Sequence, residues 1–237
     1  QQKIQLRLDL GVLQMQRDGR PDGERVHDHN SWYEYFQGQK EKHEIDHPDG
    51  TPFLLNTQDC AHLLREGLQY YHRYLSFWHL EMYDLCARDT ARNLRLFRFV
   101  CEHAEHTRDK LQFDQWRPYV TMMHARAVAT PLVKAHDHAP ALEAIHTGID
   151  DIQAFLVEYD RLESADQVGE LTFLKRWRAK IAAKVETGAG ASVDVEDPTY
   201  ELQKALDSAI AEERYEDAAR LRDEFRKETE GRTGNTE

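Results

Sequence analysis

Several features common in secreted, membrane-bound or catalytic proteins are scarce in this 237-residue chain. It has three cysteines, Cys60, Cys86 and Cys101, and no C-x-x-C pair. An odd, unpaired set predicts free thiols in a reducing compartment rather than a disulfide framework. No apolar run approaches the ~20 residues of a membrane span, and no secretory signal pattern opens the chain. We therefore expect a cytoplasmic protein without membrane attachment.

Basic residues and enzyme motifs are also scarce. Lys and Arg total 31 against 43 Asp and Glu, which gives a formal net charge of −12. Nucleic-acid binding requires clustered positive charge facing phosphates, so we expect no direct contact with DNA or RNA. The G-x-S-x-G, P-loop, G-x-G-x-x-G and H-E-x-x-H patterns are missing. We predict no catalytic residue and no cofactor.

Thirteen histidines raise the alternative of a metal-binding protein or an enzyme that uses clustered histidines and carboxylates. The clusters are His27 with His29, Cys60 with His62, Cys101 with His103 and His106, and His136 with His138. Of these, His103 and His106 have the spacing that suits two ligands on one helix. Solvated polar surface accounts for such clusters more simply, so we predict no metal site.

The N-terminal segment has the pattern of a β-strand. Apolar residues recur at every second position from Ile4 to Val12, the period of a half-buried strand. A lone strand is unstable, so this strand must pair with an upstream segment, with residues 13–16 or with a second copy of the chain. The last option would make a homodimer.

Turn and capping signals follow the strand. Gly19 and Gly23, each after an aspartate, indicate turns, and residues 47–50 read as another. Ser31 with Glu34 fits a capping box, which predicts a short helix through about residue 42.

From Thr57 onward, apolar residues recur at helical spacing in five stripes. The stripes run from Leu64 to Trp78, Tyr83 to Cys101, Trp116 to Ala127, Leu142 to Leu156 and Leu171 to Val185. Short connections predict that these helices pack as antiparallel neighbours. The aromatic cluster at 70–78 is expected in the core, the alternative being a concave surface that binds a peptide or helix.

Three prolines and two connections refine this pattern. Pro118 and Pro140 suit helix starts, whereas Pro131 should end or kink the third helix. The connections 79–84 and 135–140 look alike, and the second resembles the turn and second helix of a tetratricopeptide repeat (TPR).

The C-terminal part contains two further short stripes. Residues 187–197 begin with small residues and predict a flexible linker. The stripes consist of Leu202, Leu206 and Ala209, then Tyr215, Ala218, Leu221 and Phe225. A turn at 212–214 would bring them face to face. Two helices this short bury too little apolar area alone, so the hairpin should bind another polypeptide.

Residues 215–225 carry a pattern of aromatic-Glu-x-Ala-Ala-x-Leu-Arg-Asp-x-hydrophobic. This pattern resembles the UVR motif of excinuclease subunits B and C, of activators of bacterial protein arginine kinases and of some Clp ATPases. The resemblance implies a helical hairpin that contacts a protein partner. The partner-binding residues that it implies are Leu202, Leu206, Ala209, Tyr215, Glu216, Ala218, Ala219, Leu221, Arg222, Asp223 and Phe225.

The sequence departs from the family's pattern in two ways. Tyr215 occupies a position where Phe is commoner, and the chain lacks the paired-cysteine zinc motifs of the kinase activators. The N-terminal stretch also looks like the head of bacterial UVR-motif proteins with a helical-repeat middle, which implies a bacterial cytoplasmic setting.

The sequence thus predicts a mainly α fold: a TPR-like antiparallel helical array with a short N-terminal β element and a C-terminal UVR-type hairpin. The expected divisions are 1–50 for the β element and short helix, 51–186 for the array, 187–197 for the linker, 198–230 for the hairpin and 231–237 for a disordered tail. The predicted function is a non-enzymatic protein–protein interaction adaptor. An accessory role in excision repair or in Clp or arginine-kinase proteolysis, through a protein partner, is a further alternative.

Overall fold

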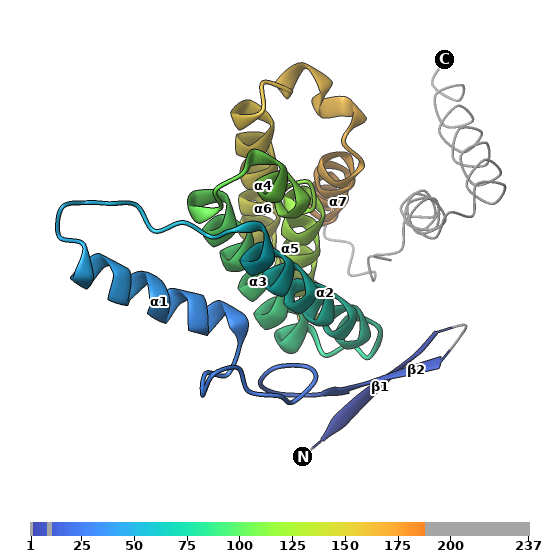
Figure 1. Cartoon of the computed structure of the whole chain (residues 1–237). Coiled ribbons are helices and arrows are strands. Elements are labelled where there is room, and N and C mark those ends of the chain that lie inside the picture. The colour runs from blue at the N-terminus through green and yellow to red at the C-terminus, as the bar shows by residue number, and fades with distance from the viewer. Residues whose placement is uncertain (1, 9–10, 188–237) are drawn as a thin grey trace, which may run out of the picture. The chain divides into compact units, whose positions relative to one another are not determined.

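The computed structural model describes residues 2–8 and 11–187 (Figure 1). The elements are β1 (Lys3–Leu8), β2 (Gly11–Gln16), α1 (Trp32–Asp46), α2 (Thr57–His79), α3 (Tyr83–His103), α4 (Thr107–Asp114), α5 (Arg117–Lys134), α6 (His138–Glu158), the 3-10 helix η1 (Leu162–Gln167) and α7 (Gly169–Thr187). The described part is therefore mainly helical with a small N-terminal sheet, as predicted. The chain divides into two compact units, Gln1–Phe155 and Leu156–Glu237. The predicted hairpin and tail, and the linker from 188 onward, lie outside the described residues.

The N-terminal strand pairs with the chain's own next segment. β1 and β2 form an antiparallel two-stranded sheet in which Ile4 faces Met15 and Leu6 faces Leu13. Of the three partners that the sequence left open, the structure therefore shows the segment that includes residues 13–16. Ile4 and Met15 are buried, whereas Val12 is 58% exposed.

Helix α1 begins where its capping signal predicts. The Ser31 hydroxyl accepts a hydrogen bond from the Glu34 amide at 3.0 Å. In a capping box the Glu34 carboxylate would accept from the amide of Ser31. Here it accepts from the amide of the preceding residue, Asn30, at 3.1 Å. The helix continues beyond residue 42 to Asp46, and Phe36 is its buried residue.

All five predicted long helices are present, as α2, α3, α5, α6 and α7. A capping box between Asn56 and Asp59 begins α2 at Thr57. Helix α3 packs against both α2 and α5. Helix α5 continues past Pro131 to Lys134, so this proline does not end the helix at its own position. The short α4 was not predicted, because eight residues are too few for a helical stripe to stand out.

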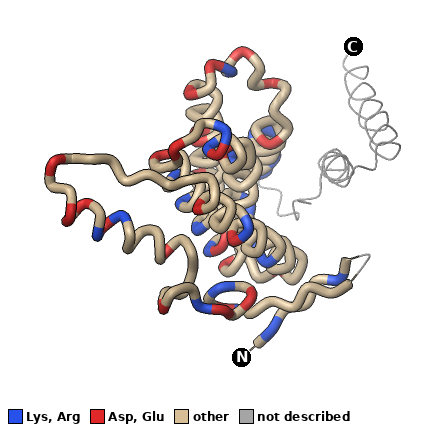
Figure 2. Tube along the Cα trace, viewed as in Figure 1, with Lys and Arg blue, Asp and Glu red and all other residues tan. Residues whose placement is uncertain are grey.

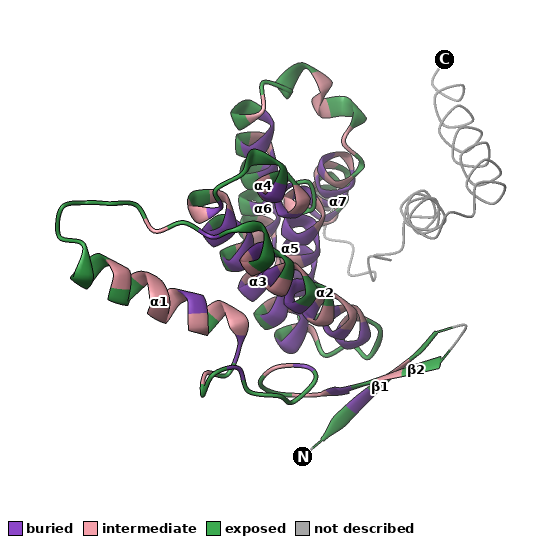
Figure 3. Cartoon of the chain, in the orientation of Figure 1, coloured by how far each residue is buried: buried purple, intermediate pink, exposed green. Residues whose placement is uncertain are grey.

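The core cluster of the first unit is formed by α1, by the segment that precedes α2, and by helices α2 to α5 (Figure 3). Its buried members are Phe36, Leu55, Cys60, Leu63, Leu96, Phe97, Phe99, Val100, Ala104, Phe113 and Val120. Leu55 is fully buried, and its amide donates to the His103 carbonyl at 2.8 Å while its carbonyl accepts from the Glu105 amide at 3.0 Å. This pairing fastens the chain before α2 to the end of α3.

The two connections that look alike in sequence have the same backbone geometry. Glu81 and His136 adopt positive φ values of 56° and 60°. In each turn the next amide donates five residues back, from Met82 to Phe77 at 2.9 Å and from Asp137 to Leu132 at 2.9 Å. Both helices thus end in a left-handed cap, a conformation that costs a non-glycine residue roughly 1 kcal/mol.

This cap generates a stability prediction. We expect His136→Gly to raise the free energy of unfolding by about 1 kcal/mol, because glycine adopts the left-handed conformation without steric cost. The same change at His146, within α6, should lower it by a similar amount because glycine is unfavourable inside a helix. Urea unfolding followed by circular dichroism measures both. Destabilisation by His136→Gly would contradict the left-handed cap at His136.

Candidate protein-interaction site

The buried face of α2 carries charged side chains. The Glu66 and Arg73 residues are 0% and 1% exposed. Two atoms of the Arg73 guanidinium donate to the Asp89 carboxylate of α3, at 2.6 and 3.0 Å, and Arg92 of α3 pairs with Glu66. Removing one partner from such a buried pair leaves an uncompensated charge, whereas the paired state is tolerated. The two ion pairs therefore determine which face of α2 meets α3.

The same charges bind the backbone of the N-terminal segment. The Glu66 carboxylate accepts from the amides of Trp32 and Tyr33 at 2.7 and 3.2 Å, where the α1 dipole favours a negative charge. Arg73 donates to the carbonyls of Gln16 and Gly19 at 2.9 and 2.7 Å. The end of the β-hairpin and the start of α1 are thus both attached to α2.

Tyr70 lies between the two arginines of this network. Its ring centroid is 4.7 Å from the Arg73 guanidinium carbon and 4.0 Å from that of Arg92, so both cations contact its π face. Burial is the main cause that raises the pKa of Tyr70, which keeps the phenol neutral. These contacts are typical of a structural role in packing rather than of an acid–base site.

Because its charged face is buried, α2 exposes part of its apolar stripe. The stripe comprises Leu64, Leu68, Tyr71, Leu75 and Trp78. Leu68 is exposed and the other four are half-buried, with Leu64 packed against the core. Leu68 is 53% exposed. The prediction that the aromatic cluster lies in the core is confirmed for Tyr70, Tyr74 and Phe77, whereas Tyr71 and Trp78 are half-buried. Each of these buried aromatic residues precedes a stripe residue by one position, which corresponds to a rotation of about 100° around the helix axis.

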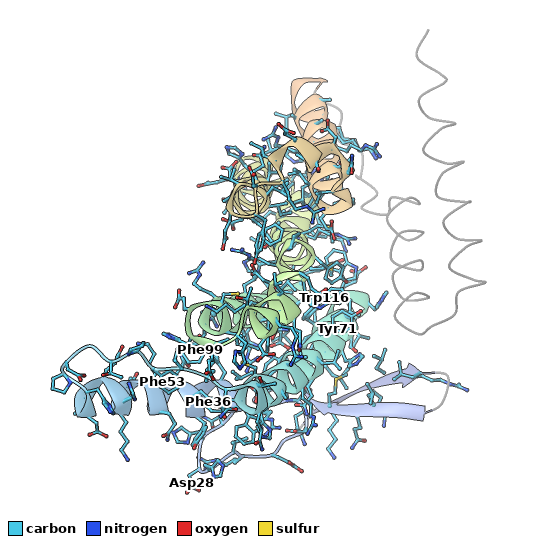
Figure 4. All side chains as sticks on the ribbon, turned by 45° about the horizontal axis from the view of Figure 1, so that its top comes forward. Asp28, Phe36, Phe53, Tyr71, Phe99 and Trp116 are labelled. Atoms are coloured by element: carbon cyan, nitrogen blue, oxygen red, sulfur yellow. The ribbon has the colours of Figure 1, made fainter. Side chains whose placement is uncertain are left out.

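Helix α4 and the start of α5 border the exposed stripe. The Thr57 hydroxyl donates to the Asp109 carboxylate at 2.7 Å, and the rings of Tyr71 and Tyr119 lie 6.4 Å apart. Leu111 of α4 and Trp116, directly before α5, are 45% and 48% exposed. In the view of Figure 4, Trp116 and Tyr71 lie to the right of Phe36, Phe53 and Phe99. We name the set Leu64, Leu68, Tyr71, Leu75, Leu111 and Trp116 the docking face.

Basic residues accompany the docking face. Arg65 precedes Leu68 by one helical turn and is exposed, and Arg108 and Lys110 lie on α4 beside Leu111. The Arg108 side chain is 77% exposed. Figure 2 shows where Lys and Arg lie among the acidic residues of this chain of net charge −12. A ligand of this face would therefore combine apolar groups with acidic ones.

The sequence-predicted partner-binding residues, from Leu202 to Phe225, all lie outside the described residues. The docking face was not among the predicted partner-binding residues, although the stripe from Leu64 to Trp78 was visible and a surface that binds a peptide or helix was the open alternative for residues 70–78. The signal that could have revealed its orientation is the pattern Glu66, Tyr70, Arg73, in which charged and aromatic residues share one face of α2.

Some histidines of the predicted clusters pack against aromatic rings. Within residues 2–8 and 11–187, no three His, Cys, Asp or Glu side chains are grouped so as to hold a metal ion. The His62 ring stacks on Trp32 with centroids 4.1 Å apart, and His103 contacts Phe99 at 4.8 Å. Burial lowers the pKa of His103, which favours its neutral form.

Buried cysteines behave as apolar groups. Burial raises the pKa of both Cys60 and Cys86 to about 12, and Cys101 is partly exposed. All three are free thiols, as predicted.

We predict that Cys101 is alkylated before Cys60 and Cys86 in the folded protein at pH 8. The thiolate is the reactive form, and it is scarce at a pH well below the pKa. Mass spectrometry after a timed iodoacetamide pulse, with urea-unfolded protein as the control, measures the order. Equal labelling of all three in the folded state would contradict the burial of Cys60 and Cys86.

We predict that Asp89→Ala lowers the free energy of unfolding by about 3–5 kcal/mol, because it leaves Arg73 buried without its carboxylate. Arg88→Ala is the control. Arg88 also pairs with Asp89, at 3.0 Å, but its side chain is 39% exposed, so its loss should cost about 1 kcal/mol or less. Equal effects in urea unfolding would show that the buried pair does not dominate.

Two further findings bear on function. No helix in the described ranges has an apolar stretch long enough to cross a bilayer. Comparison with protein-family models, with curated proteins and with solved structures finds no match to this chain.

Proposed function

We propose that this protein is an adaptor whose docking face binds an amphipathic helix of a partner protein. The observation that carries the proposal is the orientation of α2, which buries Glu66 and Arg73 and leaves Leu68 53% exposed. Single exposed apolar residues are common on protein surfaces, whereas a contiguous apolar face is typical of an interaction site.

The ion pairs prevent α2 from burying the stripe by rotating. A rotation of about 100° would turn Leu64 and Leu68 toward α3 but would separate Arg73 from Asp89. It would also remove the Glu66 carboxylate from the amides at the start of α1. Because several hydrogen bonds would be lost together, the apolar face stays available to another molecule.

The shape and charge of the face indicate the partner's chemistry. Leu64, Leu68, Tyr71 and Leu75 follow helical spacing, the arrangement that packs against apolar residues at i, i+3, i+4 and i+7 of a second helix. The basic residues Arg65 and Arg108 favour acidic residues beside that apolar stripe, chiefly by steering association. We therefore propose an acidic amphipathic helix as the ligand.

The C-terminal segment supplies a second proposed contact. The resemblance of residues 215–225 to the UVR motif supports a hairpin that binds a protein, and the helical body would then be a TPR-like scaffold between two binding elements. Tyr215→Asp and Ala219→Arg each place charge or bulk in the proposed seam. In the full chain, these variants should lose partners that the unaltered chain retains, and identical partner sets would contradict this contact.

The docking face can be tested by site-specific crosslinking in cells. We expect a photoreactive amino acid at position 68 or 116 to give a covalent adduct with one protein, and the same group at exposed position 143 of α6 to give none. Mass spectrometry identifies the adduct and the peptide crosslinked. An adduct through a non-helical or basic segment would contradict the proposed ligand class.

Binding to the identified partner then tests the apolar contact. We expect Leu68→Glu to weaken the affinity at least tenfold, because it places a negative charge in an apolar contact and beside an acidic helix. Leu80→Glu is the matched control, since Leu80 is also 53% exposed but lies after the end of α2. Equal affinities for the two variants would overturn the proposal.

A further inference from the structure

The hydrogen-bond pattern of the β-hairpin leaves part of β2 open. The Arg17 amide donates to the Gln2 carbonyl at 3.1 Å, and hydrogen-bonded pairs alternate along an antiparallel ladder. The register therefore makes Ile4–Met15 and Leu6–Leu13 hydrogen-bonded pairs. The residues of β2 that alternate with Leu13 and Met15, at positions 12, 14 and 16, direct their backbone groups away from β1.

Other parts of the chain use one end of this outer edge. The Gln16 amide donates to the Pro21 carbonyl at 2.7 Å, and the Gln16 carbonyl accepts from Arg73 at 2.9 Å. The edge that remains for another strand is centred on Leu13 and presents the backbone groups of Val12 and Gln14. Its short length restricts the register of any strand that pairs with it.

The two outer edges of the hairpin differ in charge. The outward residues of β1 include Lys3 and Arg7, and charged residues on an edge oppose pairing with further strands. An antiparallel pair of β1 strands centred on Gln5 would also place Lys3 opposite Arg7 of the second copy, which is unfavourable. No charged residue occurs in β2, from Gly11 to Gln16.

We propose that the outer edge of β2 pairs with the same edge of a second copy of this chain, antiparallel and centred on Leu13. In that register, Val12 of each copy faces Gln14 of the other. Each of these two pairs exchanges two backbone hydrogen bonds, four in total. The arrangement has twofold symmetry, so one self-complementary edge supplies both halves of the interface.

The pairing also completes an apolar surface. Leu6 and Leu13 face each other within the hairpin and are partly exposed, and Leu8 on the same face is 44% exposed. The dimer would join the two Leu6–Leu13 pairs into one row of four leucines across four strands. A two-stranded sheet is marginal alone, and four strands with a shared apolar face are more stable. The buried Ile4–Met15 pair holds the other end of the hairpin near α2 (Figure 1).

Two double variants of the full chain test this register. In V12E/Q14E, each glutamate faces a glutamate of the second copy, whereas in V12E/Q14K each glutamate faces a lysine. Both variants keep the V12E side chain opposite Arg7 within the hairpin, a favourable pair, so the hairpin itself should persist. Sedimentation equilibrium distinguishes the 27.8 kDa monomer from a dimer of twice that mass.

We expect the unaltered chain to dimerise at micromolar concentration, V12E/Q14E to raise the dimer dissociation constant at least tenfold, and V12E/Q14K to restore dimerisation. An unaltered chain that stays monomeric at about 100 µM, a concentration at which even a weak interface forms, would overturn the proposal. So would equal dissociation constants for the two variants, since only the register centred on Leu13 places position 12 opposite position 14. Crosslinking at position 68 is independent of this result, so the docking-face proposal can fail or stand separately.

Discussion

The buried pair between Arg73 and Asp89 is the interaction on which the first unit's architecture depends. Arg73 is 1% exposed, and its guanidinium binds the Asp89 carboxylate together with two backbone carbonyls of the N-terminal segment. Fully pairing a buried guanidinium offsets much of its desolvation cost, and an incomplete set of partners would not. The side chain therefore positions α2, α3 and the end of the hairpin with respect to one another.

Both proposed interaction surfaces follow from this constraint. The ion pairs hold the charged face of α2 against α3, which leaves Leu68 exposed and its stripe neighbours half-buried. The contact from Arg73 to the Gln16 carbonyl uses one end of the outer edge of β2, which limits any added strand to the stretch around Leu13. A single network of buried charges thus orients a helical surface and shortens a strand edge.

Local signals in the sequence were sufficient for much of the fold. The Ser31 cap, the turn at Gly50 and the long helices depend on contacts within a few residues, and all are present. The similarity of the two connections was also visible, and their shared backbone form confirms it. Helix α4 was missed because it is short, and part of the α2 stripe was assigned to the wrong environment because hydrophobic periodicity takes a charged position as solvent-facing.

The sequence by itself determined that the long helices form and where α1 and α2 begin, because capping and periodicity are properties of neighbouring residues. The tertiary structure decided which face of α2 is buried and which segment pairs with the first strand. Asp89 lies sixteen positions after Arg73, and Arg92 lies twenty-six after Glu66, so neither pair is visible as a local pattern. A charged residue can occupy a core only when a distant residue of opposite charge reaches it, and that condition is met only once the helices have packed.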